Sequence, residues 1–242
     1  MRLIAFPSRG VLWGAVWALA LDLVLVAALL VLWADMAATP QDLPWKPLRL
    51  ADPPGLATRM KLERAIRDSA ACRAALRDGG VPFVESPPRR EGSCHQLDAV
   101  RIVGGVTRLA PAAPIMTCGQ ALTYALWDRH SLQPAARALL GEPIAQVDHM
   151  GSYACRNMYG RQDGPRSEHA FANALDIGGF RTVGGKRLRV LGQFDDQDAE
   201  GAFLRRVRNG ACRWFHVTLS PDFNAAHRDH LHLDSGPYRS CR

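Results

Sequence analysis

The sequence lacks the composition bias of disordered, collagen-like or low-complexity proteins. Of its 242 residues, 48% are hydrophobic and 22% are charged, which is the balance of an ordinary globular chain. No internal repeat is visible either. The length allows one large or two small domains, so these absences point to a globular protein and leave its function open.

Net charge is missing from the first 58 residues, where four basic and four acidic side chains cancel. The whole formal charge of +7 therefore belongs to residues 59–242. A basic body of this kind suits an anionic partner, such as nucleic acid, a membrane surface or an acidic polymer.

Charged side chains are almost absent from Gly10–Ala34, a 25-residue apolar run in which Asp22 is the single charge. A helix of this length covers about 37 Å, more than the roughly 30 Å of a hydrocarbon core. Arginines precede the run and acidic residues follow it. By the positive-inside rule, residues 1–9 are predicted to be cytoplasmic, 10–34 to cross the membrane, and the rest to lie outside.

A cleaved signal peptide is the alternative for this run. Signal peptides usually have an apolar stretch of about 7–15 residues that ends at a small-x-small site. The run here is longer, and Ala34-Asp35-Met36 fits such a site poorly. The sequence therefore favours an uncleaved anchor. Residues 35–58 that follow carry five prolines and little periodicity, which predicts an extended, semi-rigid linker.

Cysteine is absent from the first 71 residues, and the six cysteines that follow form no CxxC pair and no zinc-finger spacing. An even number in an exported segment predicts up to three disulfides. Chain proximity suggests Cys72–Cys94, Cys118–Cys155 and Cys212–Cys241 among the 15 pairings that are open. An oxidising compartment argues against nucleic acid as the partner.

The body of the chain, residues 59–242, reads as one α+β domain with helices mainly in its first part and short strands in its second. Apolar periodicity, caps and turn residues predict the elements. Helices are expected over 59–76, 117–129, 132–140 and 198–208; strands over 100–103, 144–147, 153–156, 174–183, 186–191, 214–219 and 231–233; and a loop over 85–93.

Histidines gather in two short motifs near the end of the chain. The first is SEHAFANALD, which contains His169 and Asp176, and the second is HRDHLHLD, which contains His227, His230 and His232. Side chains two apart on a strand share a face, so His230 and His232 should project together. Two imidazoles and one carboxylate, with a fourth position left for water, are typical of catalytic zinc. Either motif alone is weak, and their joint occurrence favours a metal site.

The order S-x-H-x-x-x-x-A-x-D followed by H-x-H resembles the zinc peptidases of the LAS group. These include D-Ala-D-Ala carboxypeptidases, peptidoglycan LD-endopeptidases and the hedgehog signalling domain. The stretches GSYACR, SEHAFANALDIGGF and FHVTLSPDFNAAHRDHLHLD, with the final Cys-Arg, more closely resemble the bacterial extensin-like C-terminal domain family. The likeness covers roughly residues 60–242 and implies a hedgehog/DD-peptidase-like fold with a small antiparallel sheet.

The resemblance assigns roles to individual residues. It implies Zn²⁺ ligands at His169, Asp176 and His232, with His230 as the base. His227 matches a further active-site histidine of the LD-endopeptidases, and Arg156 is the candidate for holding substrate. Asp229 stays as the alternative base, because the carboxypeptidases carry an acid at that offset. Ala172 replaces a glycine that is usual in the first motif.

The resemblance leads to three hypotheses about function. The first is a zinc peptidase on the periplasmic side of the inner membrane that cleaves peptide cross-bridges of peptidoglycan, as an endopeptidase rather than a DD-carboxypeptidase. The second is a non-catalytic wall-binding module stabilised by zinc, since the hedgehog domain shows that this fold need not be an enzyme. The third is a disulfide-stabilised structural protein without metal.

Overall fold

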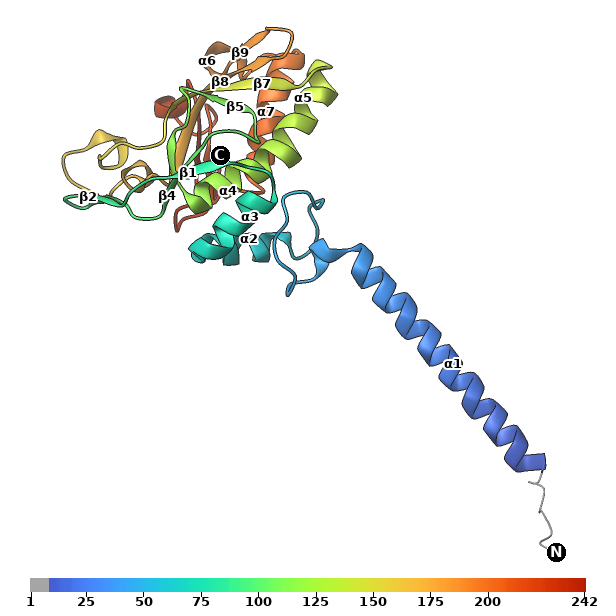
Figure 1. The fold of residues 1–242 in the computed structure, drawn as a ribbon. Coiled ribbons are helices and arrows are strands. Elements are labelled where there is room, and N and C mark those ends of the chain that lie inside the picture. The colour runs from blue at the N-terminus through green and yellow to red at the C-terminus, as the bar shows by residue number, and fades with distance from the viewer. Residues whose placement is uncertain (1–8) are drawn as a thin grey trace, which may run out of the picture.

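The computed structural model describes residues 9–242, so most of the expected cytoplasmic segment 1–9 lies outside the described residues. Its first element, α1 (Arg9–Ala38), projects away from the rest of the molecule (Figure 1). Over Val16–Ala38 this helix is long and apolar enough to cross a membrane, and none of that window is buried. The predicted apolar helix is confirmed, and its passage through a membrane stays a prediction.

The segment after α1 is not the extended linker that its prolines suggest. A 3-10 turn, η1 (Pro40–Asp42), follows the helix, and the side chains of Leu48 and Leu50 are buried in the hydrophobic core of the domain. Burial of two leucines offsets the cost of ordering the segment. The prolines fix local backbone angles, but they do not decide whether the chain packs against a neighbour.

The helix expected over 59–76 is two helices, α2 (Thr58–Arg67) and α3 (Ser69–Asp78). Asp68 between them is extended, and its Oδ1 accepts hydrogen bonds from the backbone N–H groups of Ala70 and Ala71. Asp68 is therefore the N-cap of the second helix. The apolar spacing continues across the break, which is why periodicity alone does not reveal it.

The central helix of the domain is α4 (Cys118–Trp127), in which every residue is buried. Thr117, at the start of the helix predicted over 117–129, caps it by accepting a hydrogen bond from Gln120 N–H. A π-helical turn, η2 (Asp128–Leu132), joins it to α5 (Gln133–Leu140), which ends at Gly141 in the left-handed conformation. The predicted helix near the C-terminus is α7 (Ala199–Ala211), and it packs against α5.

The remaining elements are short. The strands are β1 (Phe83–Glu85), β2 (Arg89–Glu91), β3 (Cys94–Gln96), β4 (Ala99–Ile102), β5 (Arg108–Ala110), β6 (Ile115–Thr117), β7 (Ile144–Gly151), β8 (Ala174–Thr182), β9 (Arg187–Arg189), β10 (Val217–Leu219), β11 (Leu231–Asp234) and β12 (Ser240–Cys241); the short helices are η3 (Met158–Gly160), η4 (Glu168–Phe171), α6 (Val190–Gln193) and η5 (Ala225–His227). The predicted loop 85–93 thus contains β2, and 153–156 forms no strand.

Helices and sheets are segregated as in an α+β fold, which confirms the predicted class. The main sheet has the order β12-β10-β11-β8-β7-β5, and β9 pairs with β8. Its central pairings are antiparallel, whereas β10–β12 and β5–β7 are parallel. Two small antiparallel sheets, β1-β4-β6 and β2-β3, lie outside it.

All six cysteines are paired, as predicted, but two of the three predicted partners are wrong. The disulfides are Cys72–Cys118, Cys94–Cys155 and Cys212–Cys241, and only the last follows chain proximity. The first joins α3 to the start of α4, and the second joins β3 to the loop after β7. Packing of distant elements brings these sulfurs together, so nearness in the chain is a poor guide.

Candidate metal and catalytic site

Neighbouring antiparallel strands bring the two histidine motifs together. Asp176 on β8 is directly opposite His232 on β11 in the strand register, and opposed side chains on one face lie close together. His169 comes from η4, just before β8, where Ser167 caps the turn by accepting a hydrogen bond from His169 N–H. Ala172 closes the turn in the left-handed conformation, with φ of 54°.

Three side chains meet at this point. His169 Nε2 lies 3.1 Å from Asp176 Oδ2 and 3.2 Å from His232 Nδ1, and His232 Nδ1 lies 2.8 Å from Asp176 Oδ1. Their ligand atoms all lie within 4.8 Å of one another. We call these three residues the ligand cluster. The structure thus brings together the three predicted zinc ligands.

The outer nitrogens of both imidazoles are tied to oxygen acceptors. His169 Nδ1–H donates to the carbonyl oxygen of Ser152 at 3.2 Å, and His232 Nε2–H donates to Asp234 Oδ2 at 2.9 Å. In a neutral imidazole the other nitrogen then carries a lone pair. Both inner nitrogens face the carboxylate of Asp176, so each can hold either a proton that it donates to Asp176 or a lone pair for a bound cation.

Burial and the hydrogen bonds between imidazole and carboxylate shift the pKa values in the cluster. Burial by itself would lower the pKa of His232, but hydrogen bonds to Asp176 and Asp234 raise it to about 9. Burial would raise the pKa of Asp176, but hydrogen bonds from His169 and His232 hold it well below its usual range. The cluster therefore attracts positive charge at its centre.

The donor set of the ligand cluster fits zinc. Zinc takes imidazole nitrogen and carboxylate oxygen at about 2.0–2.2 Å in a tetrahedron, which places ligand atoms roughly 3.3–3.6 Å apart. Two of the three distances among the inner atoms, 3.1 and 3.2 Å, are close to this value, and the third is 2.8 Å. Metal-binding histidines commonly donate their other N–H to a carboxylate or a backbone carbonyl, as His232 and His169 do. A divalent cation could bind all three inner atoms at once, whereas a single proton can be shared by only two of them.

His230 lies beside the ligand cluster and is paired with Asp229. Its Nδ1–H donates to Asp229 Oδ1 at 2.8 Å, and its Nε2 lies 3.7 Å from Asp176 Oδ1. His230 and His232 therefore do face the same side, as the strand pattern predicts. Asp229 points to the imidazole of His230 and contributes no atom to the ligand cluster.

His227 lies on η5 with its ring centroid 5.2 Å from that of His230 and 6.0 Å from that of His232. Its Nδ1–H donates to Asn224 Oδ1 at 2.8 Å. Burial, together with the charges of His230 and His232, lowers the pKa of His227 to about 4. His227 is therefore neutral near pH 7, with its Nε2 lone pair free to accept a hydrogen bond.

Arg156 lies on the exposed loop between β7 and η3. Its backbone carbonyl accepts a hydrogen bond from Ser167 N–H, and the disulfide of Cys155 to Cys94 holds the loop. The positive charge of Arg156 is one of the lesser causes of the lowered pKa of His227. Arg156 contributes no atom to the ligand cluster, and its charge acts on His227.

Several partners of the site have little or no signal in the sequence. Ser152 acts through its backbone carbonyl, for which no residue type is diagnostic. Asn224 caps η5 and orients His227, and an Asn three residues before a histidine could have suggested a cap. Aromatic rings of Tyr159 and Phe223 lie edge-on to His227, at centroid distances of 6.4 and 5.5 Å.

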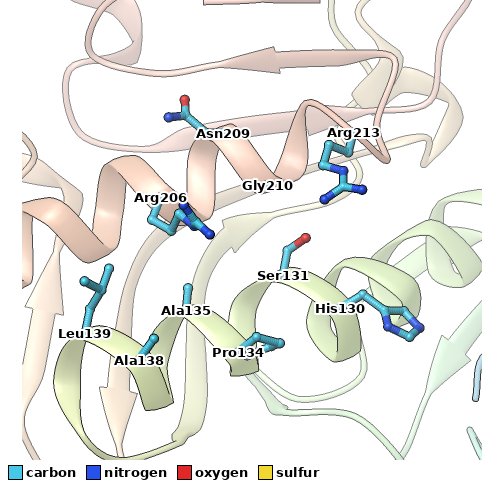
Figure 2. A pocket seen from close by; sticks show the side chains of 10 residues that line it. All are labelled: His130, Ser131, Pro134, Ala135, Ala138, Leu139, Arg206, Asn209, Gly210 and Arg213. Carbon is cyan, nitrogen blue, oxygen red and sulfur yellow. The ribbon is translucent and has the colours of Figure 1, made fainter. Parts of the chain in front are cut away.

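A separate cavity of about 660 Å³ lies between α5 and α7 (Figure 2). His130 and Ser131 on η2 and two arginines, Arg206 and Arg213, line it together with small apolar side chains from α5. None of the predicted site residues lines this cavity. It is therefore distinct from the ligand cluster and its neighbours.

The family can be assigned from the whole C-terminal region. A family model described as "Extensin-like protein C-terminus" matches residues 70–242, well over half of the chain. The chain belongs to this family. The match begins within α3 and includes every predicted site residue of the extensin-like domain. No curated protein and no solved structure matches the chain.

Proposed function

We propose that the extensin-like domain is a zinc-dependent peptidase that cleaves peptide cross-bridges of peptidoglycan in the periplasm, with α1 as its inner-membrane anchor. The observation that carries the proposal is the ligand cluster, in which two imidazole nitrogens and a carboxylate converge while both outer nitrogens are held by acceptors. The order of its residues is also that of the LAS zinc peptidases, with which the domain shares the motif S-x-H-x-x-x-x-A-x-D.

His169, Asp176 and His232 would hold the zinc ion. When bound, zinc supplies a Lewis acid that polarises a carbonyl group and lowers the pKa of water. The protein supplies the orientation of the ligands, because Ser152 and Asp234 fix the two rings from behind. Such outer partners typically change metal affinity or activity by about 10–100-fold when they are removed.

His230 is the proposed general base. Asp229 accepts its Nδ1–H, which leaves the Nε2 lone pair directed toward the ligand cluster. This nitrogen can take a proton from the attacking water and return it to the leaving amine. The carboxylate of Asp229 would stabilise the imidazolium that forms, as the aspartate of a hydrolase triad does. The geometry therefore favours His230 over Asp229 as the base.

His227 and Arg156 are proposed to contact the substrate. The neutral His227 can accept a hydrogen bond from a peptide N–H, and the exposed guanidinium of Arg156 can pair with a carboxylate. Peptide stems of the cell wall are rich in carboxylates, which also suits the positive charge of residues 59–242. Because His227 matches the LD-endopeptidases and Asp229 faces His230, endopeptidase activity is favoured over DD-carboxypeptidase activity.

Digestion of purified muropeptides, followed by mass detection, tests the activity and identifies the bond together. Wild-type protein with zinc should release cleaved peptides. His230→Ala should retain stoichiometric zinc but lose about 10²–10⁴-fold in turnover, the usual contribution of general acid–base catalysis. Asp229→Asn should lower turnover by no more than His230→Ala does, because Asp229 acts only by orienting and stabilising that imidazole. His130→Ala, in the cavity of Figure 2, is the control and should keep full turnover.

Two results would contradict this assignment. If Asp229→Asn abolishes turnover while His230→Ala does not, Asp229 is the base and DD-carboxypeptidase activity is favoured. If wild-type protein carries zinc, binds sacculi and releases no muropeptide, the domain is a zinc-stabilised wall-binding module.

A further inference from the structure

The residues that follow α1 are held by hydrogen bonds from the first turn onward. Thr39 N–H donates to Asp35 O at 3.0 Å, so the last turn of the helix runs directly into η1. Lys61 on α2 donates from Nζ to Pro40 O at 2.6 Å, and its side chain is buried there. Asp42 Oδ1 accepts a hydrogen bond from Leu56 N–H at 2.6 Å. The domain is therefore attached within four residues of the end of the apolar helix.

Three large apolar side chains stand exposed at this attachment. Leu56 is 93% exposed, Trp45 66% and Met60 51%. Arg64 links two of them, since it donates from Nη1 to Pro44 O, next to Trp45, at 2.9 Å and its Nη2 lies 4.0 Å from Met60 Sδ. Leu56 belongs to the same attachment through its hydrogen bond to Asp42. Two exposed cations, Lys46 and Arg64, flank them. We call Trp45, Lys46, Leu56, Met60 and Arg64 the collar.

The collar lies at the depth of lipid headgroups if α1 crosses a bilayer. The apolar window Val16–Ala38 has 23 residues, which as a helix cover about 35 Å against a hydrocarbon core of roughly 30 Å. The headgroup layer adds about 5–8 Å on each side. The three residues of η1 advance about 6 Å as a 3-10 helix, so Asp42, and Leu56 bonded to it, lie close to this layer.

We propose that the collar rests on the outer leaflet of the anchoring membrane, with Trp45, Leu56 and Met60 in the headgroup layer and Lys46 and Arg64 against lipid phosphates. Tryptophan and cationic side chains next to a membrane span are the usual residues of this interface. Contact with lipid accounts for the exposure of Leu56. The covalent connection to α1 keeps the collar close to the membrane surface. The inference rests on the proposed membrane placement of α1 and is independent of the zinc chemistry.

Site-directed fluorescence tests the proposal in the full-length protein. The native cysteines are all in disulfides, so without reductant a nitrobenzoxadiazole label reacts only with an introduced cysteine. The protein is reconstituted in vesicles of equal parts phosphatidylcholine and phosphatidylglycerol. Leu56→Cys, at the collar, is compared with Val183→Cys, which is 66% exposed beyond the end of β8. Leu25→Cys, within the apolar window, reports on the span.

The label at position 56 should be quenched by headgroup spin-labelled lipid at least several-fold more than the label at 183. It should also be protected from aqueous iodide, whereas the label at 183 should not. If the label at 25 is shielded but those at 56 and 183 respond alike, the collar proposal is overturned while the span stands. If the label at 25 is open to iodide, both are overturned, and muropeptide cleavage can still be measured separately.

Discussion

Two buried regions of the domain are stabilised in opposite ways. α4 is buried along its whole length, and Trp127 at its end packs against the rings of Tyr124, Phe180 and Phe215. The ligand cluster on η4, β8 and β11 is also buried or nearly so, with His169 only 2% exposed. Its inner atoms, however, are imidazole nitrogens and carboxylate oxygens rather than carbon.

This contrast separates what folds the domain from what the site requires. Apolar burial stabilises α4 without any partner from solution. The ligand cluster concentrates acceptors in a region of low dielectric, where only positive charge satisfies them. The two regions should therefore respond differently to substitution and to zinc.

The largest effect is expected in the helical region. Trp127→Ala should lower the free energy of unfolding by about 3–5 kcal/mol, because it leaves a cavity in the core and removes the hydrogen bond from Nε1–H to Val207 O. Denaturant unfolding with and without zinc measures this. Zinc should raise the free energy of unfolding of Trp127→Ala by as much as it raises that of wild type. If zinc does not stabilise the variant, the two regions are not independent.

A comparable effect, but only with zinc, is expected in the ligand cluster. At a free zinc concentration about 1,000 times the Kd, bound metal should stabilise wild-type protein by roughly 4 kcal/mol. His232→Ala should lose this increment and bind no stoichiometric zinc, as measured by thermal unfolding and metal analysis. His130→Ala should keep both. Full zinc stoichiometry in His232→Ala would remove the ligand assignment.

A smaller, pH-dependent effect is expected at Glu63 on α2. Burial would raise its pKa, but hydrogen bonds from His216 and Arg239 and the charge of Arg59 lower it. A lowered pKa gives stability that is present above pH ~4.5 and lost as pH falls through the folded-state value. Glu63→Gln should therefore cost up to about 1 kcal/mol near pH 7, since the group is partly exposed to solvent. When unfolding is measured over a series of pH values, the difference in free energy of unfolding between wild type and Glu63→Gln should disappear at acid pH. A difference that stays constant with pH would show that Glu63→Gln acts through packing and not through the charge of the carboxylate.

The smallest effect is expected at Ala172, which occupies a left-handed backbone position with φ of 54°. Glycine there relieves roughly 1–2 kcal/mol of steric cost but adds entropy to the unfolded chain. Ala172→Gly should thus change stability by less than about 1 kcal/mol. Ala174→Gly, at a buried strand position of β8, is the matched control and should be clearly destabilising. Equal losses in the two variants would contradict the strain argument.

Much of the fold can be predicted from local patterns. Thr117, Gly141 and Asp198 mark helix ends where the sequence predicts them, because caps depend on a residue and its nearest neighbours. The break at Asp68 was not predicted, although the residue is a good cap. The apolar spacing across it stays in phase, so periodicity predicts one helix where the backbone forms two.

The candidate site divides in the same way. His169, Asp176, His230 and His232 could be selected because their types and spacing are unusual, and strand alternation places His230 and His232 on one face. The groups that orient these side chains could not be selected from the sequence. The Ser152 carbonyl and the choice of Asp229 as a partner of His230 depend on where the backbone passes.

The sequence by itself determined the apolar helix, the α+β class and the oxidised cysteines, since each depends on composition or on spacing. Its resemblance to the LAS zinc peptidases singled out the residues of the ligand cluster. Only the tertiary structure decided which cysteines pair, that Leu48 and Leu50 join the core, and that both outer imidazole nitrogens meet acceptors. These features join segments separated by tens of residues. Their geometry is fixed by packing of the whole domain, which no local pattern records.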